Sequence, residues 1–298
     1  MTNNAPIVVG VDGSGSSFDA VRWAARAAEL RGAPLKLVSA YQNTNVYTTL
    51  IAIPPNIGSE MKAATTKILE AASEIASATV DDPATLSVTA EAIVGPAIPV
   101  LLERASTARM LDVGSRGNGE YFAELLGSVS AGVSTHAHCP VAIVRGVPVS
   151  GYLSGPVVVG VDGSEQNEIA IGVAFEEASL RGAELIAVHA WADHVLLRQF
   201  PDDTDEPVDV PALVAAGQAI LAESLAGWQE RYPEVKVERI VVRDSAVSKL
   251  LELSKGAQEV VVGSRGRGGF SGLMLGSTSR SLSHLVDCPM IIAREPSA

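Results

Sequence analysis

The sequence is poor in three kinds of residue, and the scarcity of cysteine and of basic residues each disfavours a class of protein. It has two cysteines in 298 residues, aromatic residues make up 4%, and 22 lysines and arginines stand against 34 aspartates and glutamates. Two cysteines cannot form a disulfide framework, and without an export signal they favour a reducing, cytoplasmic compartment. The net charge of −12 disfavours diffuse nucleic-acid binding, because neutralising phosphate backbones needs clustered cations.

Long hydrophobic runs are missing as well. No stretch approaches the roughly 20 uninterrupted apolar residues of a membrane span. Residues 1–6 lack the basic and apolar regions of a secretory signal. Hydrophobic residues still make up 47% of the chain, enough to bury a core in each of two domains. We therefore expect neither a membrane nor a nucleic acid as partner.

What the chain does contain is a duplication. The sequence I-V-V-G-V-D-G-S at residues 7–14 returns as V-V-V-G-V-D-G-S at residues 157–164. Gly114 and Gly263 each open the motif Gly-Ser-Arg-Gly, and a Gly-Ser pair follows that motif after nine residues in both copies. A spacing of 149–150 residues indicates a duplicated domain, since solenoid repeats run about 20–50 residues. We predict domains at residues 1–146 and 156–298, joined by a linker at 147–155.

Both copies alternate short apolar runs with segments of helical periodicity. The predicted strands are Ile7–Asp12, Leu35–Ala40, Leu86–Val94, Met110–Gly114 and Val141–Val144, then Val157–Asp162, Leu185–Ala190, Val235–Val242, Val260–Gly263 and Met290–Ala293. The predicted helices are a segment capped by Ser16 or Ser17 and closed by Gly32, Ser59–Ala78, Pro96–Ala108 and Gly127–Ala137, then Asn167–Arg181, Val210–Arg231, Asp244–Lys255 and Gly276–Val286. Such alternation predicts an α/β fold in which helices cover both faces of a parallel sheet.

The glycine segments after the fourth strand of each copy favour a chain of phosphates. In a doubly wound sheet, ligands bind beyond the carboxyl ends of the strands. Glycine lets the backbone approach a ligand closely, and successive N–H groups in such a turn bind anions. A helix then begins near Gly127 and near Gly276, where N–H groups, the helix dipole and serine hydroxyls favour phosphate.

Asp12 and Asp162 follow the first strand of each copy, beside the same expected crevice. A carboxylate there suits a ribose hydroxyl, although Asp-Gly-Ser is also common turn chemistry. Other phosphate motifs fail, because no G-x-x-x-x-G-K-[ST] is present. The glycines also follow strand four instead of strand one, which disfavours a dinucleotide-dependent oxidoreductase.

Together these motifs resemble the universal stress protein family, in its tandem two-domain, ATP-binding form. The resemblance rests on G-x-x-G, nine residues and G-[ST], on Asp12 and Asp162, and on Cys-Pro before each last strand. It implies two tandem Rossmann-like (adenine nucleotide alpha hydrolase-like) domains, each a five-stranded parallel sheet that binds one ATP, with Mg²⁺ an option at the phosphates. It also implies that the last strands, Val141–Val144 and Met290–Ala293, pair the two domains. A homodimer is left open.

The implied nucleotide-binding residues fall into two matched sets. In the first copy they are Gly10, Val11, Asp12, Val38, Ala40, Gly114, Ser115, Arg116, Gly117, Asn118, Gly119, Glu120, Gly127, Ser128 and Val129. In the second copy they are Gly160, Val161, Asp162, Val188, Ala190, Gly263, Ser264, Arg265, Gly266, Arg267, Gly268, Gly269, Gly276, Ser277 and Thr278.

The two sets are not identical, and their charges differ. Arg267 stands where the first copy has Asn118, and the first copy adds Asp112 and Glu120. An extra cation favours phosphate and extra carboxylates oppose it. We therefore expect the second site to bind the triphosphate more tightly.

Three functions compete: a nucleotide-dependent regulator in the stress response, a slow ATP hydrolase or nucleotidyl-transfer enzyme, and an assembly scaffold with a vestigial site. The histidines of the two copies do not stand at matching positions, which favours packing or capping over catalysis. The five histidines are His136, His138, His189, His194 and His284. We favour the regulator, with little turnover, no catalytic residue and no metal site of its own. The acidic stretch 193–209 is absent from the first copy, which favours a solvated loop over metal binding.

Overall fold

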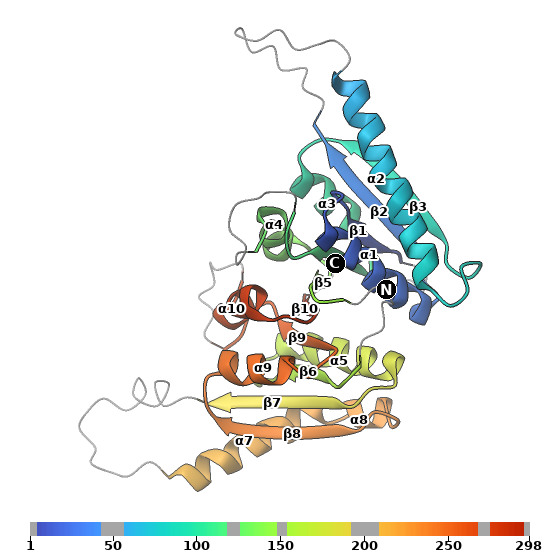
Figure 1. The fold of residues 1–298 in the computed structure, drawn as a ribbon. Coiled ribbons are helices and arrows are strands. Elements are labelled where there is room, and N and C mark those ends of the chain that lie inside the picture. The colour runs from blue at the N-terminus through green and yellow to red at the C-terminus, as the bar shows by residue number, and fades with distance from the viewer. Residues whose placement is uncertain are drawn as a thin grey trace, which may run out of the picture. The chain divides into compact units, whose positions relative to one another are not determined.

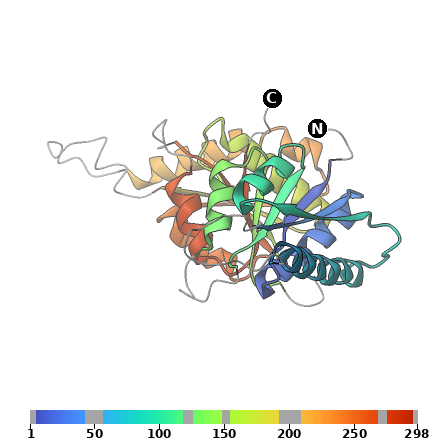
Figure 2. The same cartoon turned by 90° about the horizontal axis from the view of Figure 1, so that it is seen from above.

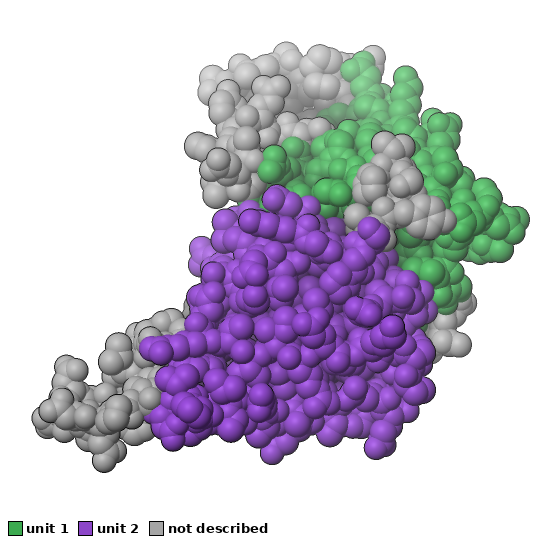
Figure 3. All heavy atoms as spheres, turned by 60° about the horizontal axis from the view of Figure 1, so that its bottom comes forward, with its two compact units in different colours: residues 1–153, 295–298 green, residues 154–294 purple. Residues whose placement is uncertain are grey.

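The computed structural model describes residues 5–42, 57–117, 126–147, 154–191, 209–267 and 275–294. The chain divides into two compact units. Unit 1 is residues 1–153 with 295–298, and unit 2 is residues 154–294 (Figure 3). The division falls within the predicted linker, of which residues 148–153 lie outside the described part of the chain. The acidic stretch lies outside it too, apart from Asp209, whose carboxylate caps the helix that follows by accepting the N–H of Ala212 at 3.1 Å.

Unit 1 is a parallel sheet with helices on both faces (Figures 1 and 2). Its elements are β1 (Ile7–Gly10), α1 (Gly15–Arg31), β2 (Leu35–Tyr41), α2 (Ile57–Thr79), β3 (Val88–Val94), α3 (Ala97–Ala105), β4 (Met110–Gly114), α4 (Ser128–His136) and β5 (Val141–Val144). The strand order is β3-β2-β1-β4-β5, with parallel pairing throughout. Helix α1 packs on α2, and α3 packs on α4. The order reverses between β1 and β4, which is where such sheets hold ligands.

Unit 2 repeats this plan with one addition. Its elements are β6 (Val157–Gly160), α5 (Asn167–Arg181), β7 (Leu185–Trp191), α7 (Val210–Leu225), α8 (Trp228–Arg231), β8 (Val237–Arg243), α9 (Ala246–Ser254), β9 (Glu259–Gly263), α10 (Ser277–Leu285) and β10 (Met290–Ala293). Its strands run β10-β9-β6-β7-β8, again parallel. The predicted α/β class with two parallel-sheet domains is confirmed.

Small residues let the first helix of each unit lie close to its sheet. The helix α1 buries Ala20, Ala24 and Ala28 completely, and β1 against it is buried from Ile7 to Val9. A strand that is covered on both faces has a continuous run of apolar residues, which is why β1 and β6 could be predicted from the sequence. Both cysteines are buried, and neither forms a disulfide.

The first strand and the first helix begin and end elsewhere than predicted. Strand β1 ends at Gly10 instead of Asp12, because Gly13 takes a φ of 84° and turns the chain out of the sheet. Helix α1 is capped by Ser14 instead of Ser16 or Ser17: the Ser14 hydroxyl accepts the N–H of Ser17 at 3.1 Å. The chain therefore turns away immediately beside the ends of β1 and β4.

The predicted single helix Val210–Arg231 is broken in two. Gly227 takes a φ of 78° between α7 and α8. The break turns the Trp228 ring onto Phe175 and Tyr232, with ring centroids 6.0 and 6.3 Å apart. By length and mean hydropathy (1.4), residues 210–231 could cross a membrane, and 17% of their most apolar window is buried. This candidate span was not predicted from the sequence. At 16 residues, however, α7 is about 24 Å long, short of a bilayer core of about 30 Å.

Candidate functional site

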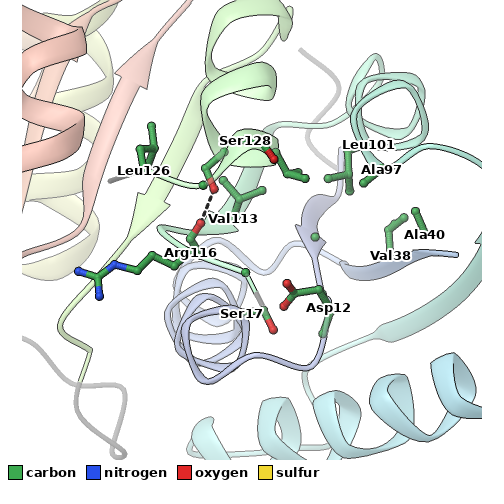
Figure 4. Close-up of a pocket in the computed structure, with 17 residues that line it drawn as sticks. Asp12, Ser17, Val38, Ala40, Ala97, Leu101, Val113, Arg116, Leu126 and Ser128 are labelled. Carbon is green, nitrogen blue, oxygen red and sulfur yellow. Dashed lines mark hydrogen bonds between the residues drawn. The ribbon is translucent and has the colours of Figure 1, made fainter. Parts of the chain in front are cut away.

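A cavity of about 430 Å³ opens in unit 1 beyond the carboxyl ends of β1 and β4 (Figure 4). It lies where the strand order reverses. The residues that line it are Gly10, Val11, Asp12, Ser17, Val38, Ala40, Ala97, Leu101, Val113, Gly114, Arg116, Gly117, Leu126, Gly127, Ser128, Val129 and Ser130. The cavity thus has a carboxylate on the side of β1, an apolar wall from β2, α3 and β4, and backbone amides from the glycine segment and α4.

Asp12 organises the turn at the tip of β1. Its Oδ1 accepts the Ser14 N–H at 2.9 Å and the Ser14 hydroxyl at 2.6 Å. The Ser14 hydroxyl also lies 3.3 Å from the carbonyl oxygen of Arg116, in the glycine segment. The Asp12 side chain is exposed. The turn chemistry and the proposed ribose contact are therefore compatible, because Asp12 makes the turn with one oxygen and remains accessible from the cavity.

Two glycines are required by close contacts instead of by backbone angles. A Cβ on Gly117 would lie 2.6 Å from Oδ2 of Asp12, and one on Gly114 would lie 2.6 Å from the Ser16 carbonyl. Both distances are shorter than real Cβ contacts, so a side chain would push the glycine segment away from the β1 turn. The spacing of the motif therefore reflects how closely the segment after β4 passes the first turn.

The N-terminus of α4 faces the cavity. Its N-cap is Gly127, which has no side chain to bond the first N–H groups, and Ser128 is exposed at the first helical position. The Gly127 N–H donates to the Ser115 carbonyl at 2.9 Å. The Ser130 hydroxyl donates to the Gly114 carbonyl at 2.6 Å. These two bonds fix the helix start against the end of β4. Such a helix start suits an anion.

Unit 2 has the corresponding cavity, of about 560 Å³. Its lining residues are Gly160, Val161, Asp162, Asn167, Val188, His189, Ala190, Trp191, Ala246, Leu250, Val262, Gly263, Arg265, Gly266, Arg267, Leu275, Gly276, Ser277, Thr278 and Ser279. A Cβ on Gly266 would lie 2.5 Å from Oδ2 of Asp162, which repeats the contact in unit 1. Helix α10 again starts after a glycine, Gly276, without a side-chain cap.

The structure brings most of the predicted site residues to these two cavities. Ser115 and Ser264 do not line them: the N–H of Ser115 donates to Val144, that of Ser264 donates to Ala293, and both carbonyls accept from the helix-start glycine. The backbone bonds of these two serines hold the glycine segment to the last strand and to the helix start of its unit. Asn118, Gly119, Glu120, Gly268 and Gly269 lie outside the described residues. Whether the lining residues bind nucleotide stays a prediction at this point.

One argument for unequal sites is wrong. Asp112 does not line the cavity of unit 1; it is completely buried within β4, beside Val9 and Ala142 of the neighbouring strands. Its neighbour Val113 does line the cavity. Successive strand residues point to opposite faces, so Asp112 faces away from the cavity. It gives no reason for weaker phosphate binding in unit 1.

The part of the apolar wall that comes from α3 and β4, and from α9 and β9 in unit 2, was not predicted from the sequence. Leu101 and Val113 in unit 1 and Leu250 and Val262 in unit 2 line the same side of each cavity. They read as ordinary core residues, because nothing local distinguishes a core side chain at the edge of a cavity. Two signals could have found them. Each pair recurs at the duplication's spacing of 149 residues, and each valine directly precedes the glycine that ends its strand.

His189 is a second omission, since it was predicted to be a packing or capping residue. It is buried at the cavity of unit 2, and its Nδ1 lies 2.8 Å from the Val161 carbonyl oxygen. A carbonyl can only accept, so the Nδ1 carries the proton. The matching residue in unit 1 is Ser39. His189 thus holds the tip of β6 and is engaged there, which leaves its packing role intact.

Catalytic groups are sparse at both cavities. The only carboxylate among the described lining residues is Asp12 in unit 1 and Asp162 in unit 2. Each accepts two hydrogen bonds from the serine two residues later. Within the described ranges, no group of three or more His, Cys, Asp or Glu side chains could hold a metal ion. The arrangement suits binding of a polyanion with an apolar head.

Comparison with known proteins gives a consistent match along the chain. The model of the universal stress protein family matches residues 3–145 and 154–294. Universal stress protein Rv2623 of Mycobacterium tuberculosis is 41% identical, covering 97% of this chain and 96% of that protein. A universal stress protein from Archaeoglobus fulgidus, 20% identical, superimposes with a TM-score of 0.67 over 99% of both chains. A universal stress protein in complex with cAMP is 30% identical, with a TM-score of 0.35, over 47% of this chain and 96% of that one.

Proposed function

Because the chain belongs to the universal stress protein family, with one family match in each unit, we propose that each unit binds one adenine nucleotide, ATP in preference. The observation that carries this proposal is the pair of matching cavities. Each cavity has a carboxylate at one end and an uncapped helix N-terminus at the other. The same features recur in the second unit 149–150 residues later in the sequence.

The lining divides by chemistry as a nucleotide would require. Val38, Ala40 and Leu101 offer an apolar surface to adenine in unit 1. Asp12 accepts a hydrogen bond from a ribose hydroxyl in addition to the bonds of the turn. The amides of the glycine segment, with Ser128, hold the phosphates at the start of α4, and Mg²⁺ enters with those phosphates. Unit 2 uses Val188, Ala190, Asp162 and Ser277 in the same way.

The output of binding is regulation, with little turnover. Hydrolysis needs a group that orients water and accepts its proton. Asp12 and Asp162 are committed to the turn and the ribose, and His189 to a backbone carbonyl. A turnover number on the order of 1 per second or above, typical of enzymes, would instead assign the chain to the ATP hydrolases.

Calorimetry on the full chain tests the proposal directly. We expect two ATP per chain, with ADP, AMP, cAMP and GTP titrated alongside as competitors. Heat denaturation of freshly isolated protein should release an adenine nucleotide, identifiable by mass. A chain that binds none of these nucleotides and releases none would contradict the proposal and favour the scaffold.

Three further expectations about assembly and location stay predictions. Strands β5 and β10 are apolar and end their units' strand orders, and an unpaired strand edge invites pairing. In a chain without its native cysteines, Ile143→Cys and Ile292→Cys should form an intramolecular disulfide if β5 and β10 pair. Sedimentation analysis decides whether two chains associate further. Cell fractionation tests the cytoplasmic location.

A further inference from the structure

The two cavities share their frame but differ in the groups near the helix start. Helix α10 presents Thr278 at its second position, where α4 presents Val129, and both residues line their cavities. A threonine hydroxyl can donate a hydrogen bond to a phosphate oxygen, and a valine methyl of nearly the same volume cannot. Unit 2 therefore has one more donor at the place where a polyphosphate would lie.

Arg267 adds a cation to the cavity of unit 2. Its N–H donates to Oδ2 of Asp162 at 2.9 Å, which fixes the backbone of the glycine segment to the turn after β6. Its Nη2 donates to the Gly163 carbonyl at 3.3 Å, a long bond to a neutral acceptor. A bond from a guanidinium to phosphate is shorter and roughly twice as strong as a neutral one. The Arg267 guanidinium can therefore exchange its bond to the Gly163 carbonyl for a stronger bond to phosphate, while the Arg267 N–H keeps its bond to Asp162.

The charge of the two linings differs in the same direction. Among the described lining residues, unit 1 has one arginine, Arg116, against Asp12. Unit 2 has two arginines, Arg265 and Arg267, against Asp162. Each phosphate added to a nucleotide adds negative charge, which the second arginine of unit 2 attracts. The gain from each added phosphate is therefore larger in unit 2, and the base and ribose contribute nothing to that difference.

We propose that the two units differ in selectivity for the number of phosphates, with unit 2 as the triphosphate-selective site. Arg267 and Thr278 distinguish a nucleoside triphosphate from its monophosphate there, whereas unit 1 holds both with more similar affinity. This inference rests on the proposed function, since it concerns the same cavities. The chain then combines a site that senses the state of phosphorylation with one that responds mainly to the total nucleoside phosphate.

The test separates the units within the full chain. Ala40→Trp fills the apolar end of the cavity of unit 1, and Ala190→Trp does the same in unit 2. Calorimetry with ATP and with AMP then gives the ratio of the two dissociation constants for the open unit. We expect the ratio for unit 2 to exceed that for unit 1 by about tenfold or more, because a charge-assisted bond and a hydroxyl are added.

Exchange of residues between the copies sharpens the result. In the chain with only unit 2 open, Arg267→Asn and Thr278→Val together should weaken ATP about tenfold and change AMP less than about twofold. Val129→Thr should strengthen ATP in unit 1 by a smaller factor. Arg280→Asn is the matched control, because Arg280 is exposed on α10 and does not line the cavity. It removes the same charge and should leave the ratio unchanged.

Fluorescence offers a second reading if the tryptophan substitutions disturb folding. Trp191 lines the cavity of unit 2, while the other two tryptophans, Trp23 and Trp228, line neither cavity among the described residues. Its emission in the unmodified chain should respond to ATP at lower concentration than to AMP, and Arg267→Asn should reduce that difference. Equal ATP-to-AMP ratios in the two units, or an Arg267→Asn chain that loses ATP and AMP alike, would overturn the inference. Loss of all nucleotide binding by the unmodified chain would instead refute the proposed function.

Discussion

Both units join the glycine segment to the turn after the first strand by hydrogen bonds, and the side chains around that turn differ. In unit 1, the Ser16 hydroxyl on the first turn of α1 accepts the Arg116 N–H at 3.3 Å and lies 3.4 Å from the Ser115 hydroxyl. In unit 2, the backbone N–H of Arg267 donates to Oδ2 of Asp162 at 2.9 Å. Both bonds tie the glycine segment to the turn after the first strand.

The start of the first helix also differs between the two units. Helix α1 begins at Gly15, whereas α5 begins at Asn167, two residues later in the repeat. The Asn167 amide accepts the Asp162 N–H at 3.2 Å and donates to the Gly160 carbonyl at 3.0 Å. Asn167 therefore supports the tip of β6, which in unit 1 is left to the turn. Gly117 and Gly266, in contrast, keep the same close approach to the aspartate of their unit.

The largest expected effect breaks one cavity and spares the other. Gly266→Val places a Cβ 2.5 Å from Oδ2 of Asp162, too close for both to keep their positions. We expect ATP binding by unit 2 to fall by at least about 100-fold, since the glycine segment and the carboxylate can no longer approach. Gly117→Val should do the same to unit 1 only. Calorimetry should show one remaining site in each variant.

The control for these substitutions is Gly15→Ala. No atom lies within 4 Å of a Cβ at Gly15. It should leave both sites intact, because alanine is favoured over glycine in a helix. Two full sites in Gly266→Val would contradict the contact argument.

The next effect concerns stability and addresses unit 2 alone. Trp228 stacks on Phe175 and Tyr232, and the matching residues 78–80 of unit 1 contain no aromatic ring. Trp228→Ala should lower the free energy of unfolding of unit 2 by about 2–4 kcal/mol, because a large half-buried ring is lost. Scanning calorimetry should show one transition shifted. Trp228→Phe should recover part of the loss, and a shift of both transitions would argue that the units unfold together.

A pH effect distinguishes the buried thiol of unit 2. Burial, with the Glu259 carboxylate nearby, raises the pKa of Cys288 from 9.0 to about 12. The folded state keeps its proton where the unfolded chain has lost it, so this contribution to stability is full below pH 9 and is lost as the pH rises toward 12. Stability measured against pH should therefore fall less steeply in Cys288→Ala over that range. At pH 8, a thiol reagent should not label Cys288 in the folded chain, and rapid labelling would contradict its burial.

The smallest effect lies at the sheet edge of unit 1. Glu91 on β3 accepts from Arg104 at 2.8 Å and pairs with Lys36 at 3.2 Å, and these partners lower its pKa. The matching position in unit 2 is Ile240. Glu91→Gln should cost less than about 1 kcal/mol, since partly exposed ion pairs contribute little. The cost should be full near neutral pH and vanish as the pH falls through the lowered pKa, whereas Ile240→Val should show no such dependence. Urea denaturation at several pH values measures both.

The comparison also shows how far sequence reasoning reaches into the site. The motif Gly114–Gly117, Asp12 and the pairs Gly127-Ser128 and Gly276-Ser277 were predicted, and the structure brings them to one cavity in each unit. They could be predicted because each sits where a strand ends or a helix begins, and such ends carry local signals in glycine, serine and aspartate. Leu101 and His189 carry no local signal, and Val113 carries only its position before the glycine that ends its strand. The role of all three depends on which face of a strand or helix meets the cavity.

The sequence by itself determined the duplication, the α/β class and the positions of the glycines. These follow from periodicity along the chain and from backbone approaches that only glycine permits. Tertiary structure alone decided that Asp112 faces away from the cavity, that the helix breaks at Gly227 and Trp228 stacks on Phe175, and that Arg267 reaches the turn at Gly163. Those outcomes depend on strand register and on packing between distant segments, where free energy is gained only once the chain has closed on itself.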